Sequence, residues 1–325
     1  MKNIFVTGGA GFIGSNFIRH LIAHNPDLHI VNYDCLTYAG NLTNLNGLPT
    51  DAHYTFVGRN ICRMASVMAT LRGHHIDTII NFAAESHVDR SIDAGEQFIR
   101  TNVVGTSMLL ECALRHSIKM FVQIGTDEVY GSLEEGSPSS VETDLLMPRS
   151  PYAASKASAD LLALSYFHTH GLPVCVTRSS NNYGAYQYPE KIIPLFITNI
   201  LRGKKVPVYG EGRNIRDWLH VEDNCRAIEC VMMNGRPGEV YNIAGGNEIR
   251  NIELTERVLT LLGKQDWQLF VDYVKDRKGH DWRYSMNCDK IRNELGWQPQ
   301  VLFEDGLRDT VKWYERNETW WKRLI

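Results

Sequence analysis

Short apolar runs and helical patterns alternate along the first 180 residues. The run Ile4-Phe5-Val6 predicts a buried strand, and a glycine-rich turn then leads into a helix whose apolar face recurs at helical spacing. Further strands are predicted at 29–34, 54–57, 78–82, 120–124 and 173–177, and further helices at 67–71, 98–115 and 155–168. Because strands that alternate with helices pair in parallel, the pattern predicts an α/β fold with a doubly wound parallel sheet.

The pattern changes after about Asn181. Aromatic residues, prolines and glycines become dense there, and later helices are predicted near 252–262 and 303–315. We therefore expect a Rossmann-type domain over 1–180 and about 214–248. A smaller α/β lid, over about 181–213 and 249–325, is expected to bind the substrate.

Composition narrows the class of protein. Hydrophobic residues make up 43% and charged residues 22% of the chain, as in ordinary globular enzymes. The net charge of −3, without a block of like charge, argues against nucleic acid as a partner. No apolar run has the length of a membrane helix or a secretory signal, so we expect no membrane partner and a cytoplasmic location. The seven cysteines lack zinc or redox spacing, which predicts reduced thiols and no metal site.

Three glycines mark a candidate dinucleotide site. Gly8, Gly11 and Gly14 lie between the first strand and the first helix, where a tight turn and a helix N-terminus can hold a pyrophosphate. Asp34 ends the next strand, twenty residues after Gly14, and its carboxylate can accept both ribose hydroxyls of NAD. No arginine follows Asp34 directly, which favours NAD over NADP. The alternative is a tight turn without a ligand.

Two further groups of residues suggest proton transfer. Tyr152 and Lys156 are four residues apart in a predicted helix, so the lysine ammonium is expected to lower the pKa of the phenol. Thr126, Asp127 and Glu128 follow a predicted strand, at the sheet edge where doubly wound folds bind ligands. Two adjacent acids can also form a solvated loop, and Tyr-x-x-x-Lys alone is a common surface pair.

The glycine spacing G-x-x-G-x-x-G resembles that of the extended short-chain dehydrogenase/reductase enzymes, which act on nucleotide sugars. Within them, the acid pair after Thr126 is similar to that of the dTDP-glucose 4,6-dehydratases, whereas epimerases usually carry small residues there. The resemblance extends over nearly the full length, through segments 82–91, 101–106, 150–156, 180–184, 189–191, 216–218 and 276–281.

The resemblance implies a lyase of deoxysugar biosynthesis with NAD as a tightly held cofactor. Thr126 would bond the reacting oxygen of the sugar, and Tyr152 would take the proton of the C4 hydroxyl as hydride passes to NAD. Glu128 would then remove the C5 hydrogen while Asp127 protonates the leaving C6 hydroxyl, because the new C4 ketone makes the C5 hydrogen acidic. Return of the hydride to C6 would give a 4-keto-6-deoxy sugar.

The resemblance also implies two sets of binding residues. The expected NAD-binding residues are Gly8, Gly11, Phe12, Ile13, Gly14, Asp34, Leu36, Thr37, Asn60, Ile61, Phe82, Ala83, Ala84, Ser86, Thr101, Tyr152, Lys156 and Asn182. The expected substrate-binding residues are Ser86, Thr126, Asn181, Lys191, Ile192, Pro207, Val208, Tyr209, Arg216, Asn251, Arg277, His280 and Tyr284. Among these, Lys191, Arg216 and Arg277 suit a diphosphate and Tyr209 a pyrimidine base, while a structural role for His280 stays open.

Several alternatives stay open at the level of sequence. A UDP-sugar 4,6-dehydratase or a nucleotide-sugar epimerase would use the same fold, and a catalytically silent dinucleotide-binding regulator is a different class. Gly125, Ala185 and Asn60 replace the residues usual in the family. The resemblance also implies a homodimer formed through the helices that contain residues 101–115 and 155–168.

Overall fold

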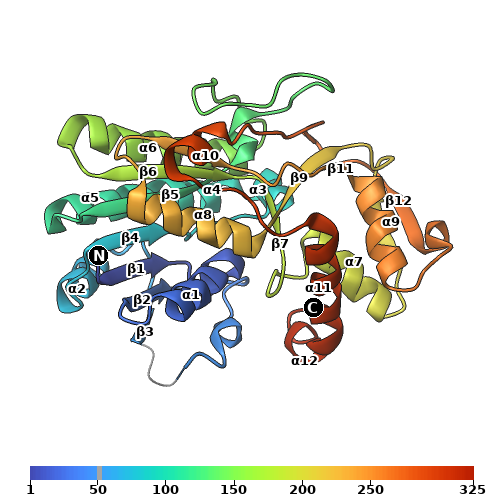
Figure 1. Ribbon diagram of the computed structural model, residues 1–325, viewed down its shortest axis with the longest axis horizontal. Coiled ribbons are helices and arrows are strands. Elements are labelled where there is room, and N and C mark those ends of the chain that lie inside the picture. The colour runs from blue at the N-terminus through green and yellow to red at the C-terminus, as the bar shows by residue number, and fades with distance from the viewer. Residues whose placement is uncertain (50–52) are drawn as a thin grey trace.

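A seven-stranded parallel sheet forms the centre of the computed structural model, which describes residues 1–49 and 53–325 (Figure 1). The strand order is β10-β6-β5-β4-β1-β2-β3, so the direction of winding reverses between β1 and β4. This order confirms the predicted doubly wound fold, and it places the carboxyl ends of β1 and β4 at the ligand-binding position of such sheets. The strands are β1 (Asn3–Thr7), β2 (His29–Asp34), β3 (Tyr54–Gly58), β4 (Thr78–Asn81), β5 (Met120–Thr126), β6 (Val174–Ser179) and β10 (Val240–Ile243).

Helices cover both faces of this sheet. Successive strand residues point to opposite faces, so Ile4 and Val6 of β1 pack in one hydrophobic core and Phe5 packs in the other. The first core includes residues of α1 (Phe12–His24), α8 (Val221–Asn234) and α10 (Asp289–Leu295). The second includes residues of α2 (Met64–Gly73), α5 (Thr106–His116) and α6 (Pro151–His170). Burial on both faces explains why the strands are continuous apolar runs.

A third hydrophobic core lies beyond the end of the sheet, at the right of Figure 1. This core is formed by two small sheets, of strand order β11-β9-β7 and β12-β8, and by four helices that pack on them. Trp321 and Tyr314 are fully buried in it. The strands are β7 (Asn181–Tyr183), β8 (Val206–Tyr209), β9 (Ile215–His220), β11 (Glu248–Arg250) and β12 (Val271–Val274). The helices are α7 (Ile192–Leu201), α9 (Asn251–Leu261), α11 (Phe303–Arg316) and α12 (Glu318–Trp321).

The helix predicted at 98–115 is built from three consecutive segments. They are α4 (Gly95–Phe98), the π-helical η2 (Ile99–Gly105) and α5. Leu109 and Leu110 of α5 are fully buried, whereas Val103 of the π-helical segment is only partly buried. A π-helical segment changes the angle between successive side chains, so the apolar face upstream of α5 turns away from the expected direction.

The remaining short segments are α3 (Val88–Asp93), η1 (Leu42–Leu45), η3 (Asp127–Tyr130) and η4 (Trp267–Phe270). Among residues 1–49 and 53–325, no helix is long and apolar enough to cross a membrane. All seven cysteines are free thiols.

Candidate active site

The turn between β1 and α1 is too tightly packed to hold side chains. Gly8 has φ +67°, and a Cβ placed on it would lie 2.7 Å from the backbone nitrogen of Ala83 after β4. A Cβ on Gly14 would lie 2.4 Å from the carbonyl oxygen of Gly8. Gly11 is the N-cap of α1 and offers no side-chain oxygen to its first N–H groups. The turn therefore leaves a helix N-terminus open to an anion such as a pyrophosphate.

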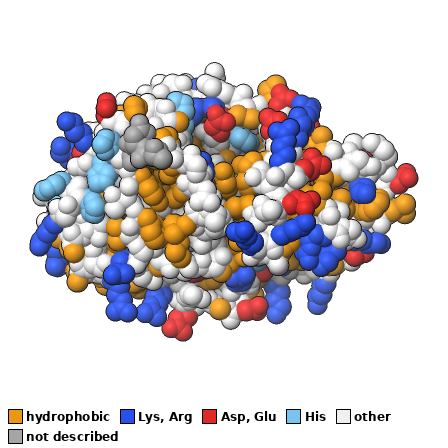
Figure 2. All heavy atoms as spheres, turned by 90° about the horizontal axis from the view of Figure 1, so that it is seen from below, with side chains coloured by type: hydrophobic (Ala, Val, Ile, Leu, Met, Phe, Trp, Pro, Cys, Tyr) orange, Lys and Arg blue, Asp and Glu red, His pale blue; other side chains and the backbone are white. Residues whose placement is uncertain are grey.

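A cavity of about 1080 Å³ opens from this turn across the carboxyl ends of β1, β4 and β5. All of the expected NAD-binding residues line it except Leu36. Leu36 has φ +53° and a side chain that is 41% exposed, so the structure places it outside the lining. Seen from below, apolar side chains gather near the middle of this face of the molecule (Figure 2). The glycine cradle and this lining fit a dinucleotide.

Asp34 ends β2 with a buried carboxylate in the wall of the cavity. Its Oδ2 accepts from the backbone N–H of Ala10 at 3.0 Å, and its Oδ1 accepts from that of Leu36 at 2.8 Å. Burial raises the pKa of Asp34, while these N–H groups oppose the shift. The two hydrogen bonds fix the carboxylate at the strand end, and each oxygen keeps a lone pair for a ribose hydroxyl.

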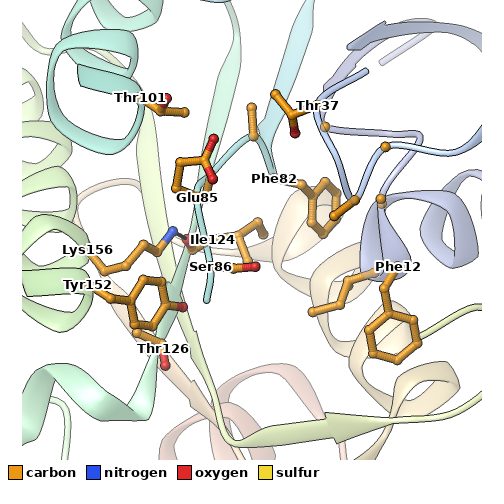
Figure 3. Close-up of a pocket in the computed structure, with 18 of the residues that line it drawn as sticks. Phe12, Thr37, Phe82, Glu85, Ser86, Thr101, Ile124, Thr126, Tyr152 and Lys156 are labelled. Carbon is orange, nitrogen blue, oxygen red and sulfur yellow. Dashed lines mark hydrogen bonds between the residues drawn. The ribbon is translucent and has the colours of Figure 1, made fainter. Parts of the chain in front are cut away.

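Two elements bring the proposed catalytic side chains together. Thr126 is the last residue of β5, and α6 begins at Pro151, after Ser150, whose hydroxyl accepts from the backbone N–H of Ala153 at 3.0 Å. Tyr152 and Lys156 lie one turn apart on α6 and both line the cavity, with Tyr152 beside Thr126 and Lys156 directed at Ile124 (Figure 3). The Nζ of Lys156 donates to the carbonyl oxygen of Ile124 on β5 at 2.5 Å.

Asp127 is buried and Glu128 is partly buried, and each has one buried carboxylate oxygen without a hydrogen bond to residues 1–49 or 53–325. In the described part of the chain, Oδ2 of Asp127 and Oε2 of Glu128 have no hydrogen-bond partner. Thr126 holds the pair in place, because its hydroxyl donates to Oδ1 of Asp127 at 3.1 Å and accepts from the backbone N–H of Glu128 at 3.3 Å. Buried polar atoms are almost always paired, so the free oxygens point to a bound ligand or a reacting group.

Burial raises the pKa of both carboxyls, and the charges around them separate the two values. Burial, and next the charge of Glu128, raise the pKa of Asp127 well above its ordinary value. Burial also raises the pKa of Glu128, but the cations Arg277, Lys191 and Arg216 oppose that shift. One group can thus stay protonated while its neighbour is ionised, as an acid and a base acting together require.

The expectation that Lys156 lowers the pKa of Tyr152 is wrong for the protein by itself. Burial and the nearby charge of Glu128 raise the pKa of the Tyr152 phenol, and Lys156 is not among the groups that offset them. The hydroxyl of Thr126 opposes the shift. Spacing on a helix showed that the two side chains share a face, but it could not show the depth of burial or the acids that face the phenol from η3.

The expected diphosphate ligands approach the acid pair from the C-terminal half. Lys191 lines the cavity, and its Nζ donates to the carbonyl oxygen of Ser86 at 2.8 Å. Arg216 is buried under the ring of Tyr284, with 4.2 Å between guanidinium and centroid. Arg277 reaches Asp89 at 3.5 Å. Because all three cations lower the pKa of Glu128, they form a positive region on the substrate side of the acid pair.

The structure divides the expected substrate-binding residues. Ser86, Thr126, Asn181 and Lys191 line the cavity, and the buried Oδ1 of Asn181 has no partner within residues 1–49 and 53–325. The structure places the others outside that lining: Ile192, Pro207, Val208, Tyr209, Arg216, Asn251, Arg277, His280 and Tyr284.

The strand expected to hold the base, β8, shows how these outer residues lie. The side chain of Val208 packs in the third core, whereas Tyr209 is 40% exposed and donates to Asp89 at 3.0 Å. The rings of Tyr209 and His280 are 6.1 Å apart. Burial, followed by the charges of Arg216 and Arg277, lowers the pKa of His280 to about 4, so this imidazole is neutral near pH 7.

Several cavity residues were not anticipated. They include Glu85, which points into the cavity (Figure 3), and Arg100, Gln187, Tyr188 and Glu190. Glu85 lies inside the segment 82–91 that carried the resemblance, so its position was a usable signal. Glu190 likewise lies inside the segment 189–191, whereas Arg100, Gln187 and Tyr188 lie outside these segments and only the fold brings them to the cavity.

Comparisons with known proteins agree with this geometry. The family model of GDP-mannose 4,6 dehydratase matches residues 5–310. A dTDP-glucose 4,6-dehydratase of Streptomyces niveus is 52% identical, over 99% of this chain and 95% of that protein. The crystal structure of a dTDP-glucose 4,6-dehydratase from Streptomyces venezuelae, with NAD and TYD bound, is 49% identical and superposes with a TM-score of 0.96, over 99% and 100% of the two chains. A UDP-glucose 4-epimerase of Thermotoga maritima is 29% identical, with a TM-score of 0.89 over 97% of this chain and 99% of that one.

Proposed function

The chain belongs to the dTDP-glucose 4,6-dehydratase family, and on that premise we propose that it removes water from dTDP-glucose to form dTDP-4-keto-6-deoxyglucose. The family resemblance is thus confirmed. The observation that carries the proposal is that, among the described residues, Asp127 and Glu128 each have a buried carboxylate oxygen without a hydrogen bond, in the cavity that Tyr152 and Lys156 also line. This hydro-lyase reaction belongs to deoxysugar biosynthesis.

The first step needs a base at the C4 hydroxyl of the sugar. Tyr152 takes that proton, Thr126 bonds the same oxygen, and the ammonium of Lys156 stabilises the phenolate. NAD, when bound, accepts hydride from C4 and later returns it to C6. Burial and the charge of Glu128 raise the pKa of Tyr152, and the hydroxyl of Thr126 opposes this shift.

The second step eliminates water across C5 and C6. Glu128 removes the C5 hydrogen, because three cations oppose the effect of burial and favour its ionised form. Asp127 gives its proton to the leaving C6 hydroxyl, because burial and the charge of Glu128 keep it protonated. A deep, buried setting strengthens both effects and excludes competing proton donors.

The two halves of the chain divide the binding. Residues 1–180 and about 214–248 hold NAD on the glycine cradle and on Asp34, while residues 181–213 and 249–325 hold the nucleotide sugar. Lys191, Arg216 and Arg277 supply positive charge for the diphosphate. Tyr209 is available to stack on the base. We also propose a cytoplasmic homodimer.

A product assay tests this function. Incubation of the purified protein with dTDP-glucose is expected to form a 4-keto sugar, seen by its absorbance in strong base, with the bound NAD unchanged at the end. UDP-glucose is the matched control substrate, since thymine and uracil differ by one methyl group, worth about 1–3 kcal/mol in an apolar pocket. Turnover of UDP-glucose without turnover of dTDP-glucose would contradict the base preference. No keto product from either substrate would contradict the reaction and favour an epimerase or a silent regulator.

A further inference from the structure

A buried ion pair lies behind the catalytic lysine. Asp160 follows Lys156 by one turn of α6 and is fully buried, and Nε of Arg178 on β6 is 3.0 Å from its Oδ2. Arg178 also donates to the hydroxyl of Tyr130 at 2.8 Å, and that hydroxyl donates to Asn242 at 2.8 Å. The network joins α6, η3 and the strands β6 and β10, so the position of Asp160 is fixed.

One oxygen of Asp160 has no hydrogen bond. Its Oδ1 is buried and unpaired among the residues that the structure describes. Gly125 of β5 lies close to the carboxylate of Asp160. A Cβ on Gly125 would be 3.0 Å and 3.1 Å from the two oxygens of Asp160, and 2.7 Å from the carbonyl oxygen of Thr177. The residue before Gly125 is Ile124, whose carbonyl accepts from Lys156. The absence of a side chain at Gly125 thus lets the carboxylate approach the strand that holds the lysine.

The buried ammonium of Lys156 stays charged more readily when a negative group lies near it. Burial lowers the pKa of its ammonium, and the charge of Asp160 is the one that opposes this shift. The other charged or titratable groups around the site are Tyr152 on α6, Asp127 and Glu128 on η3, Glu85 on the cavity side (Figure 3), and Arg178 on β6. The carboxyls of η3 raise the pKa of Tyr152, and Asp160 adds a smaller effect in the same direction. Burial raises the pKa of Asp160, but Arg178 and Lys156 oppose that shift, and Asp160 in turn raises the pKa of Lys156.

We propose that Asp160 is a positioning residue that keeps the Lys156 ammonium charged and directed at β5, so that the lysine can stabilise the phenolate of Tyr152. The inference rests on the proposed function, since it assigns a role within the C4 oxidation step. Asp160 does not touch the substrate; it acts through Lys156. Arg178 holds the carboxylate through Oδ2 and prevents it from turning away.

The test is the pH profile of kcat with dTDP-glucose, between pH 6 and 10. Asp160→Asn keeps the shape of the side chain and removes its charge. The alkaline limb should then move to lower pH by about one unit or more, as loss of an opposite charge near an ammonium dictates. The KM for dTDP-glucose should stay unchanged. Tyr130→Phe is the matched control: it removes a hydrogen bond of the same network but leaves the charge, so its alkaline limb should match the wild type.

A double variant guards against loss of the fold. Asp160→Asn leaves the Arg178 charge buried and unpaired, which is costly, whereas removal of both charges of a buried pair is often tolerated. Asp160→Asn/Arg178→Gln should therefore fold and show the same shift. An unmoved alkaline limb in the double variant, or a loss of kcat that is uniform across pH, overturns the role of Asp160 but leaves the proposed function intact. A wild type that forms no keto sugar overturns the proposed function, and this inference with it.

Discussion

At the scale of single residues, the account depends on how burial divides two neighbouring carboxyls. Asp127 and Glu128 were visible in the sequence, and so was their place after a strand. Their unpaired oxygens and the rise of both pKa values were not, because burial causes the rise and only the fold shows it. The cations that oppose it at Glu128 come from distant parts of the chain. The same limit explains the wrong expectation for Tyr152, whose acidity is governed by burial rather than by a helical neighbour.

Arg277 is expected to influence the pH at which activity falls on the acid side of the pH profile. It is the first of the charges that lower the pKa of Glu128 against burial, so Arg277→Gln should raise that pKa further. A base must be ionised, and activity falls as the pH drops through its pKa. The acid limb of kcat/KM should therefore move to higher pH, by roughly 0.5–1 unit, and KM should rise with the loss of a diphosphate ligand.

The exposed Arg213 provides the control for this experiment. Its side chain is 67% exposed and pairs with Glu211, so Arg213→Gln should leave both the limb and KM unchanged. An acid limb that stays in place, or moves to lower pH, in Arg277→Gln would show that Arg277 does not act on the base.

At the scale of elements, periodicity predicted the first six strands of the central sheet because each is a short buried apolar run, but it missed α8 and α10, which cover one face of that sheet. It also missed α7, which is apolar nearly all round, and β10, a strand of four residues that returns to the sheet edge after the lid begins. Short strands of this kind depend on pairing partners far away in the sequence. For the same reason β8 was recognised by resemblance, but the inward direction of Val208 was not.

A contact between the loop after β2 and the C-terminal half is expected to retain the cofactor. The hydroxyl of Tyr38 donates to Glu190 at 2.8 Å. The guanidinium of Arg90 stacks on the ring of Tyr38, with 3.8 Å between the guanidinium carbon and the ring centroid. Neighbouring residues of both segments line the cavity. Tyr38→Phe removes a hydrogen bond to a charged group, so NAD should dissociate roughly tenfold faster or more in a dilution experiment followed by NAD content.

Tyr54→Phe is suited as the reference variant for NAD release. The Tyr54 hydroxyl accepts from Asn32 at 2.9 Å, in the same half of the chain but away from the lid. An unchanged rate of release in Tyr38→Phe would mean that this contact does not retain NAD.

At the scale of the whole molecule, the sequence predicted the fold class and the family, and the comparisons confirm both. The homodimer stays a prediction. The helices expected to form it expose apolar side chains: Ile99 is 48%, Val104 41% and Leu161 57% exposed. Sedimentation equilibrium should give twice the mass of one chain for the wild type. Leu161→Lys should lower the measured mass to that of one chain, because a buried interface excludes an unpaired charge.

Leu269→Lys is the control for the dimer, since Leu269 is 68% exposed on η4, far along the chain from the expected interface. A dimer that persists in Leu161→Lys and dissociates in Leu269→Lys would place the interface on the lid.

The measurement that most directly tests the elimination step is the reaction of dTDP-glucose in D₂O, followed by NMR of the product. Removal of the C5 hydrogen by Glu128 and later reprotonation should leave one deuterium at C5, while C6 receives the original C4 hydride and carries none. Glu128→Gln should keep bound NAD but form no 6-deoxy product at the normal rate. A C4 epimer without deuterium at C5, or normal turnover by Glu128→Gln, would contradict the account.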